Sequence, residues 1–331
     1  MRRTLGLWIG AVGVAFAVAA CTSKSTPPEE MTGTGPDAAT HDATADVASS
    51  DGGSSQDAAS DADAGDGADA TFALCNPTLG WPMVARVPSI ASMGFDRFGA
   101  VSSSGRTVAW STSTGGVFVA DRASPSAAFA APVAINPGSV SIGQGRVALA
   151  DSGLKLIVPR ADGRTFVSFV RASVGAPWGN PLANEFANFE SATGELGGSL
   201  SEPVVSADNL SLFYVIVLGA GSGPLLYESQ WNAPMRAWDP GNPLPNPEFA
   251  IIDANHLRRP TGASADRRTL FFFDEVSGKQ RAAWRNDPSA PFGTFVDVPQ
   301  TPEAAPDENC ETLYFRGTDT SGPGLFTATR P

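Results

Sequence analysis

Short apolar runs separated by turn-forming residues dominate the sequence from residue 71 to residue 331. Runs such as 107–110, 210–217 and 269–273 consist largely of β-branched and aromatic side chains, which are enriched in strands. Gly, Pro and Ser punctuate these runs, and the region lacks the long apolar periodicity of helices. The pattern predicts an all-β domain.

A turn followed by a strand recurs along this region. Clear copies begin at Ser102, Ser206 and Ser264, and weaker copies begin at Ser141 and Asp307. Ser, Asp, Asn and Gly suit tight turns because their side chains bond the local backbone or tolerate unusual dihedral angles. Five such turns predict five repeated units.

A second unit follows the turn, and it has an arginine, then an aromatic residue, then a proline. The copies are Arg122, Phe129 and Pro132; Arg171, Trp178 and Pro181; Arg285 and Phe292 without the proline; and a drifted copy with Trp231, Trp238 and Pro240. The units recur about 40–65 residues apart, a length that fits blades of four strands.

The fifth copy is divided between the two ends of the region. The chain stops at residues 328–331, where other copies continue to the aromatic residue and the proline. The missing part is found at residues 76–84, which contain Trp81 and Pro82. A repeat divided in this way is how a β-propeller closes, because the first strand of the domain then completes the last blade.

The two units together resemble the TolB-type, WD-like propeller repeat of bacterial envelope proteins, over nearly all of residues 71–331. The resemblance implies an all-β propeller of about five four-stranded blades, closed by the N-terminal strand of the domain. The 65-residue interval between Ser141 and Ser206 leaves room for a sixth blade. Propellers of this type dock proteins or peptides at the mouth of the central channel, so the resemblance implies a partner of that kind.

Residues 1–20 have the pattern of a signal peptide. Arg2 and Arg3 precede an uncharged run from residue 5 to residue 20, which is shorter than the roughly 20 residues of a spanning helix. The run ends in Val-Ala-Ala-Cys, which resembles the bacterial lipobox and implies that Cys21 carries a lipid anchor in the membrane. Thr22 is not Asp, the residue of the inner-membrane retention signal. We therefore expect the outer membrane of the cell envelope, on its periplasmic or surface side.

Residues 21–70 are expected to form a disordered acidic linker after the lipidated cysteine. From residue 22 onward this stretch holds one lysine against eleven acidic residues and almost no large apolar side chain. Its aspartates, which include Asp57, Asp61 and Asp63, lack the spacing of an EF-hand loop, so a solvated spacer is favoured over a calcium site. The remaining 261 residues, the propeller domain at 71–331, carry a net charge of only −4. Such a domain has no basic surface for nucleic acid.

Two cysteines remain besides Cys21. In an oxidising compartment Cys75 and Cys310 are expected to form a disulfide, which would join the closing strand to the blade it completes. A long loop of this kind contributes on the order of 4 kcal/mol in the chain-entropy model. Three cysteines with His41 and His256 are too few for a closed zinc site, so no metal or other cofactor is predicted.

No catalytic residue is predicted. The sequence contains no Gly-x-Ser-x-Gly nucleophile elbow, and both histidines fall in expected linker or loop segments. Glu185, Glu190 and Glu195 form the most interesting acidic cluster, although an ordinary insertion loop is the favoured interpretation.

Other recurring side chains are expected to be structural. Six tryptophans, Trp81, Trp110, Trp178, Trp231, Trp238 and Trp284, are assigned mainly to the blade cores. Arg122, Arg171 and Arg285 are expected to bond neighbouring blades. The leading hypothesis is a non-catalytic scaffold that binds an envelope protein, peptide or other ligand. The alternative is a carbohydrate-active propeller that binds or hydrolyses glycans, which would need paired carboxylates at an open channel mouth.

Overall fold

The computed structural model describes residues 75–90, 97–182, 184–218, 224–246, 249, 258–299 and 303–330, all of which lie within one compact unit, Asp63–Pro331. These residues form five small antiparallel sheets. In the described part of the chain, no helix is both long and apolar enough to cross a membrane.

The five sheets are the blades of a β-propeller. Blade 1 contains β2 (Arg97–Val101), β3 (Thr107–Ser111), β4 (Val117–Asp121) and β5 (Val133–Ala134). Blade 2 contains β6 (Ala148–Ala150), β7 (Lys155–Pro159) and β8 (Phe166–Val170). Blade 3 contains β9 (Ser199–Val205), β10 (Ser211–Val217), β11 (Leu225–Asn232), β12 (Ala237–Trp238) and β13 (Asn242–Pro243). Blade 4 contains β14 (Arg258–Ala263), β15 (Thr269–Asp274), β16 (Lys279–Trp284) and β17 (Thr294–Val298).

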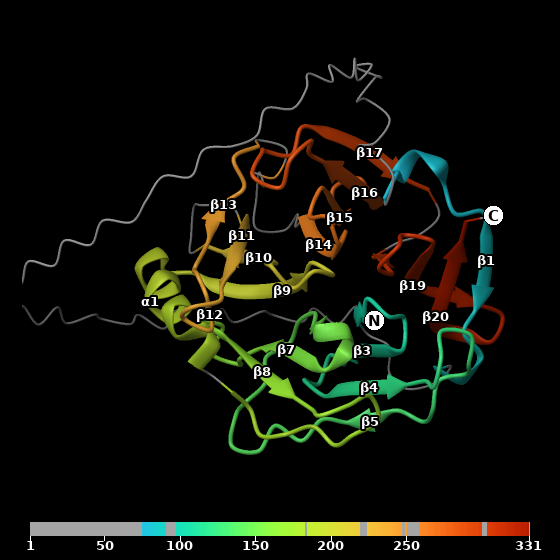
Figure 1. Ribbon diagram of the computed structural model, residues 1–331, viewed down its shortest axis with the longest axis horizontal. Coiled ribbons are helices and arrows are strands. Elements are labelled where there is room, and N and C mark those ends of the chain that lie inside the picture. The colour runs from blue at the N-terminus through green and yellow to red at the C-terminus, as the bar shows by residue number, and fades with distance from the viewer. Residues whose placement is uncertain are drawn as a thin grey trace, which may run out of the picture. The chain divides into compact units, whose positions relative to one another are not determined.

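Blade 5 is built from both ends of the domain, as the divided repeat predicts. Its strands are β18 (Ala305–Pro306), β19 (Thr312–Asp319), β20 (Gly322–Thr329) and β1 (Met83–Arg86). The first strand pairs antiparallel with the last, with Met83 opposite Thr329 and Arg86 opposite Phe326. Figure 1 shows cyan β1 lying beside red β20. The predicted fold class and its closure are confirmed.

The innermost strands β2, β6, β9, β14 and β18 pack against one another around the axis of the propeller (Figure 1). Close packing here requires small residues. A Cβ on Gly262 of β14 would lie 2.2 Å from Cδ of Pro306 in the next blade, and one on Gly99 would lie 2.5 Å from the Ala109 carbonyl oxygen. Glycine at these positions lets the backbones of neighbouring strands approach.

All five blades turn between their first two strands, and in blades 1, 3, 4 and 5 the amide of the fourth turn residue donates to the carbonyl of the first. The fourth residue of every turn has a positive φ: 64° at Gly105, 92° at Gly153, 61° at Asn209, 58° at Arg267 and 55° at Cys310. The first residue supplies a side-chain acceptor in blades 1, 3, 4 and 5; the Oγ of Ser264, for example, accepts from the Thr269 amide at 2.9 Å.

The turn of blade 2 corrects one sequence prediction. It lies at residues 150–154, within and beside η4 (Asp151–Gly153), and not at Ser141. The position taken by serine in three other blades is Ala150 here, which has no side-chain acceptor. This turn has a different conformation, in which Asp151, Ser152 and Gly153 all have a positive φ and the Leu154 amide donates to the Asp151 carbonyl at 3.0 Å.

The described residues hold no sixth blade in the interval after Ser141. The additional residues form η5 (Asn184–Phe186) and the ten-residue helix α1 (Ala187–Leu196), which Figure 1 shows at the outside of the ring near β12. Blade 2 also lacks a regular fourth strand. A single bridge between Ser168 and Leu182 takes its place, and the adjacent Pro181 has no amide to extend the pairing.

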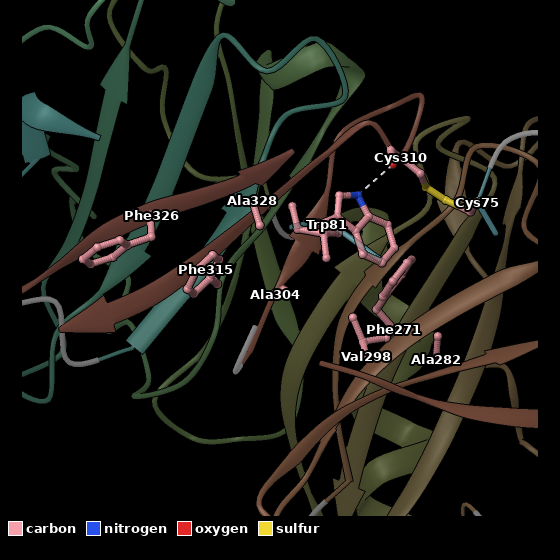
Figure 2. Packing of buried hydrophobic residues seen from close by; sticks show 11 residues of the cluster. Cys75, Trp81, Phe271, Ala282, Val298, Ala304, Cys310, Phe315, Phe326 and Ala328 are labelled. Atoms are coloured by element: carbon pink, nitrogen blue, oxygen red, sulfur yellow. Dashed lines mark hydrogen bonds between the residues drawn. A yellow bond between two sulfur atoms is a disulfide. The ribbon is translucent and has the colours of Figure 1, made fainter. Parts of the chain in front are cut away.

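The cores of blades 4 and 5 meet around the N-terminal segment. Figure 2 shows Trp81 between Phe271 of blade 4 and the strands of blade 5. The indole N–H of Trp81 donates to the carbonyl of Cys310 at 3.0 Å. Cys310 forms a disulfide with Cys75, and their Cα atoms lie 5.1 Å apart, within the usual range. The segment that starts the domain, which includes η2 (Pro77–Leu79), is therefore held to its last blade.

Candidate functional site

The central channel is too narrow for an organic ligand. The cavity between the innermost strands measures about 30 Å³, room for about two water molecules, and small side chains such as Ala148, Val204, Ala263 and Ala305 line it. Among the described residues, no carboxylate lines this cavity. The arrangement that the glycan hypothesis needs, paired carboxylates at an open mouth, is not present at this position.

The turns form a hydrogen-bonded collar around one end of the channel. The Glu308 amide donates to the Ser103 carbonyl at 3.1 Å, which joins blade 5 to blade 1. The Oγ atoms of Ser103 and Ser152 lie 3.3 Å apart. The contacts that continue the collar are a hydrogen bond from the Asp151 amide to Asn209 Oδ1 at 2.7 Å and an ion pair between Asp208 and Arg267 at 2.9 Å. These contacts link the turns of blades 5, 1, 2, 3 and 4 in that order.

A buried arginine occupies the other end of the channel. Arg146 lies just before β6 and is 1% exposed. Its guanidinium donates to the carbonyls of Gly99 at 3.1 Å, Thr261 at 3.4 Å and Glu303 at 3.4 Å, which belong to or adjoin blades 1, 4 and 5. One side chain of blade 2 thus bonds three other blades across the axis.

The recurring arginines join neighbouring blades, as the sequence predicts. Arg171 of blade 2 binds both carboxylate oxygens of Asp121 of blade 1, at 2.6 and 2.8 Å. Arg285 of blade 4 binds both oxygens of Glu228 of blade 3, at 2.7 Å each. Burial tends to raise the pKa of Asp121, but its bonds from Arg171 and Thr107 outweigh this effect and lower the pKa below its usual value.

The turn unit and the arginine unit of the repeat belong together. In blades 1, 2 and 4 the arginine Nε donates to the carbonyl of the left-handed turn residue of the same blade, at 2.6–2.9 Å. The guanidinium also lies over the aromatic ring seven residues later, 4.4 Å from the centroids of Phe129 and Trp178 and 4.3 Å from that of Phe292. This double contact explains why the arginine and the aromatic residue recur at a fixed spacing.

Blade 3 departs from this pattern. Trp231 replaces the arginine and packs edge-on against Trp238, with ring centroids 5.3 Å apart. Lys155 of blade 2 lies 5.0 Å from the Trp231 ring, so the cation comes from the neighbouring blade. Of the six tryptophans, Trp81, Trp110 and Trp238 are buried as expected, while the other three are partly exposed.

The glutamate cluster does not form a constellation of carboxylates. Glu185 pairs with Lys155 at 3.1 Å and accepts from the Ser168 hydroxyl at 3.0 Å. Glu190 and Glu195 are exposed on α1. The helix itself is fixed by Phe186 and Phe189, which pack with Phe166 and Tyr214 in the core. This is the ordinary insertion that the sequence favours.

Two open grooves lie at the rim of the propeller, between neighbouring blades. The groove between blades 3 and 4 measures about 640 Å³, and Glu228, Arg285 and several prolines line it. The groove between blades 5 and 1 measures about 390 Å³; Arg122, Tyr314, Thr327 and Thr329 are among its lining residues. Both grooves are large enough to receive a ligand. Sequence reasoning did not identify them, because each is made by two repeats whose contact no local pattern reveals.

Several predicted residues lie outside the described part of the chain. These are the lipidation site Cys21, the linker aspartates, His41 and His256. Within the described residues, no group of three or more His, Cys, Asp or Glu side chains is placed to hold a metal ion.

Comparisons with known proteins identify no family for this chain. No protein-family model matches it, and no curated protein matches it. Among solved structures it is similar to TolB from Acinetobacter baumannii, with 8% identity over 70% of this chain and 54% of that one, at a TM-score of 0.37. It is also similar to the calcium-binding protein regucalcin from Agrobacterium tumefaciens, with 12% identity over 67% of this chain and 70% of that one, at a TM-score of 0.40.

A third similar structure is the Dos1 propeller, with 12% identity and a TM-score of 0.36. The chain covers 66% of its own length in that match but only about half, 52%, of the other chain. The propeller assignment itself rests on the strand pairing of the five blades.

Proposed function

We propose that this chain is a lipid-anchored protein of the bacterial envelope whose propeller serves as a non-catalytic binding scaffold. Its partner would be another envelope protein or a peptide. The anchor is supported by the sequence, where a positive start, an apolar run and a small-small-Cys motif resemble a lipobox with Cys21 as the acylated residue. The acidic stretch after Cys21 would then serve as the tether between membrane and propeller.

The observation that carries the scaffold role is the use of the charged residues of the repeat. Arg171 and Arg285, each 4% exposed, are bound by carboxylates of the preceding blade, and Arg146 is bound by three carbonyls across the axis. These contacts hold the ring in one shape. A rigid surface loses little conformational freedom when a partner binds, and this favours recognition.

The anchor can be tested by metabolic labelling of the full chain in a bacterium with an outer membrane. We expect incorporation of an alkyne-labelled palmitate and recovery in the outer-membrane fraction. A Cys21→Ser variant should lose the label and leave that fraction. Labelling that persists in Cys21→Ser, or unlabelled wild-type protein, would overturn the anchor.

The scaffold role can be tested by photo-crosslinking in living cells. A photoreactive amino acid would replace Ser126 in the groove between blades 5 and 1, or Ala290 in the groove between blades 3 and 4. The exposed Ser191 on α1 provides a matched control position. We expect discrete crosslinked products from a groove position only. Equal background at all three positions, or release of glycan or peptide fragments from envelope material by the purified chain, would contradict a non-catalytic scaffold.

A further inference from the structure

The repeat arginine of blade 1 lacks the carboxylate partner that two of its counterparts have. Arg122 lies over Phe129 and donates through Nε to its own turn at Gly105, as the other repeat arginines do. Toward blade 5, however, its contact is the hydroxyl of Tyr314, at 2.7 Å. Arg122 is also partly exposed, whereas Arg171 and Arg285 are each 4% exposed.

Strand register shows which residues of blade 5 replace the missing carboxylates. Asp121 stands opposite Thr107, and the equivalent pair in blade 5 places Thr329 opposite Thr312. Glu228 stands opposite Phe213, and the equivalent pair places Thr327 opposite Tyr314. Threonine therefore occupies both positions from which a carboxylate reaches the arginine elsewhere. Both threonines line the groove of about 390 Å³ beside Arg122.

The other blade interfaces show that this combination is unusual within the molecule. Where Trp231 replaces the arginine in blade 3, the two carboxylate positions of blade 2 are Val170 and Ser168, so cation and anion are lost together. In blade 5, Arg330 donates instead to the carbonyl of Asn76, in the N-terminal segment. Blade 1 retains its guanidinium and has an open groove where the anion would lie.

We propose that this groove binds a carboxylate of an acidic peptide, which takes the place that Asp121 and Glu228 fill at the other interfaces. This inference rests on the proposed binding role and names its site and ligand class. The planar guanidinium suits two parallel hydrogen bonds to a carboxylate, the geometry that Arg171 and Arg285 display. The hydroxyls of Thr312 and Thr329 line the same groove and can donate to the oxygens, whereas that of Thr327 already donates to the Ala85 carbonyl at 3.4 Å.

The surroundings favour a peptide over a free ion. The groove is much larger than one carboxylate group. Arg86, at the end of β1, lines the same groove, but its charge is paired with Asp319, so Arg122 is the cation proposed to bind the ligand. β1 is the outermost strand of blade 5, and it offers an extended peptide a strand edge beside the charge.

The first test measures binding of a fluorescein-labelled Ala-Asp-Ala-Glu-Ala peptide to the purified full chain in detergent, by fluorescence anisotropy. Arg122→Gln should weaken binding at least tenfold, in keeping with a lost charge-assisted hydrogen bond. The matched control, Arg164→Gln, removes an exposed arginine of blade 2 and should leave binding unchanged. The Asn/Gln version of the peptide should not bind.

The second variant supplies the missing carboxylate from the chain itself and leaves Arg122 in place. Thr327→Glu places a carboxylate where Glu228 stands at the equivalent interface. It should raise the melting temperature, because Arg122 gains a partner, and it should abolish peptide binding. A Thr327→Glu chain that binds the peptide as well as wild type overturns the proposal, as does a wild-type chain that binds no acidic peptide.

Two further arms identify the source of the carboxylate. Displacement of the peptide by millimolar acetate would show that the carboxylate alone is sufficient for recognition, in place of the peptide ligand proposed here. A full chain with Asp57, Asp61, Asp63, Asp66 and Asp69 changed to Asn should bind the labelled peptide more tightly if its own linker occupies the groove. If crosslinks in the groove between blades 5 and 1 persist in Thr327→Glu, the scaffold role is retained but the proposed peptide site is contradicted. If the wild-type chain gives no crosslinks in either groove, the scaffold role itself is contradicted.

Discussion

The guanidinium of Arg330 lies 4.4 Å from the ring centroid of Trp81, although the two residues come from opposite ends of the domain. In blades 1, 2 and 4 the equivalent arginine and ring follow each other along one segment of chain. Here the same contact is made across the closure, and the indole N–H replaces the arginine in bonding the left-handed turn residue, Cys310. The contact is therefore part of the repeat and also a joint that closes the ring.

This joint should be measurable as a coupling energy. We expect Trp81→Leu and Arg330→Met to destabilise the domain, with a coupling of about 0.5–2 kcal/mol between them in a double-mutant cycle. Trp81→Phe, which keeps a ring but leaves the Cys310 carbonyl without its donor, should cost about 1–3 kcal/mol. Urea unfolding gives these values. The same cycle with Arg164→Met in place of Arg330→Met should give additive changes in the free energy of unfolding. A coupling energy of zero between Trp81 and Arg330 would contradict a stabilising role for their contact.

The disulfide should stabilise the domain independently of the backbone conformation of the turn that contains Cys310. Removing it in Cys75→Ser/Cys310→Ser should cost about 2–5 kcal/mol in the free energy of unfolding. Cys310 has a φ of 55°, where other blades have Gly105 or Gly153. Cys75→Ser/Cys310→Gly should therefore be about 1–2 kcal/mol more stable than the double serine variant, since glycine adopts this conformation freely. Equal stabilities in urea would show that the turn does not strain residue 310.

The ion pair between Asp121 and Arg171 should make the free energy of unfolding depend on pH in the acidic range. The pKa of Asp121 is lower in the folded chain than its ordinary value of 3.8, so its contribution is present above that value and is lost as pH falls through the folded pKa. We expect Asp121→Asn to cost about 1.5–3 kcal/mol at pH 7, because Arg171 stays buried without its charged partner. Urea unfolding at several pH values should show this difference shrinking below about pH 4. A constant difference would contradict the assignment.

Close packing at the axis gives a matched pair of glycine variants. Gly262→Ala should destabilise the domain by about 1–3 kcal/mol, because its Cβ would lie 2.2 Å from Cδ of Pro306. Gly293 has no atom within 4 Å of the equivalent position, so Gly293→Ala should be nearly neutral. Thermal unfolding compares the two, and a neutral Gly262→Ala would mean that the inner strands can separate without cost.

The repeat could be read from sequence because its residues carry local physical signals. Turn positions are indicated by polar side chains such as Ser264 and Asp266, and core positions are indicated by the aromatic residues. The turn of blade 2 was misplaced because Ala150 has no polar side chain to mark it. The bonding role of Arg171 and Arg285 followed from their recurrence, but their partners did not, since Asp121 and Glu228 occupy different strand positions.

The candidate groove beside Arg122 could not be predicted in the same way. Its argument depends on which residues of blade 5 stand opposite Thr312 and Tyr314, and register is known only once strands are paired. Arg146 is a similar case. A lone arginine before a short apolar strand gives no sign that its partners are carbonyls on three other blades.

The pairing of β1 with β20 also sets the order in which this domain can be completed. Of the described strands, β1 leaves the ribosome first and its partner leaves last, so β1 must wait with an unpaired edge while the other four blades are synthesised. Contacts between such distant segments form slowly. A chain shortened before β20 would lack both the pairing of β1 and the ring contact of Arg330, and would present a free strand edge prone to aggregation. The propeller ring can therefore close only after its last strand, β20, has been synthesised.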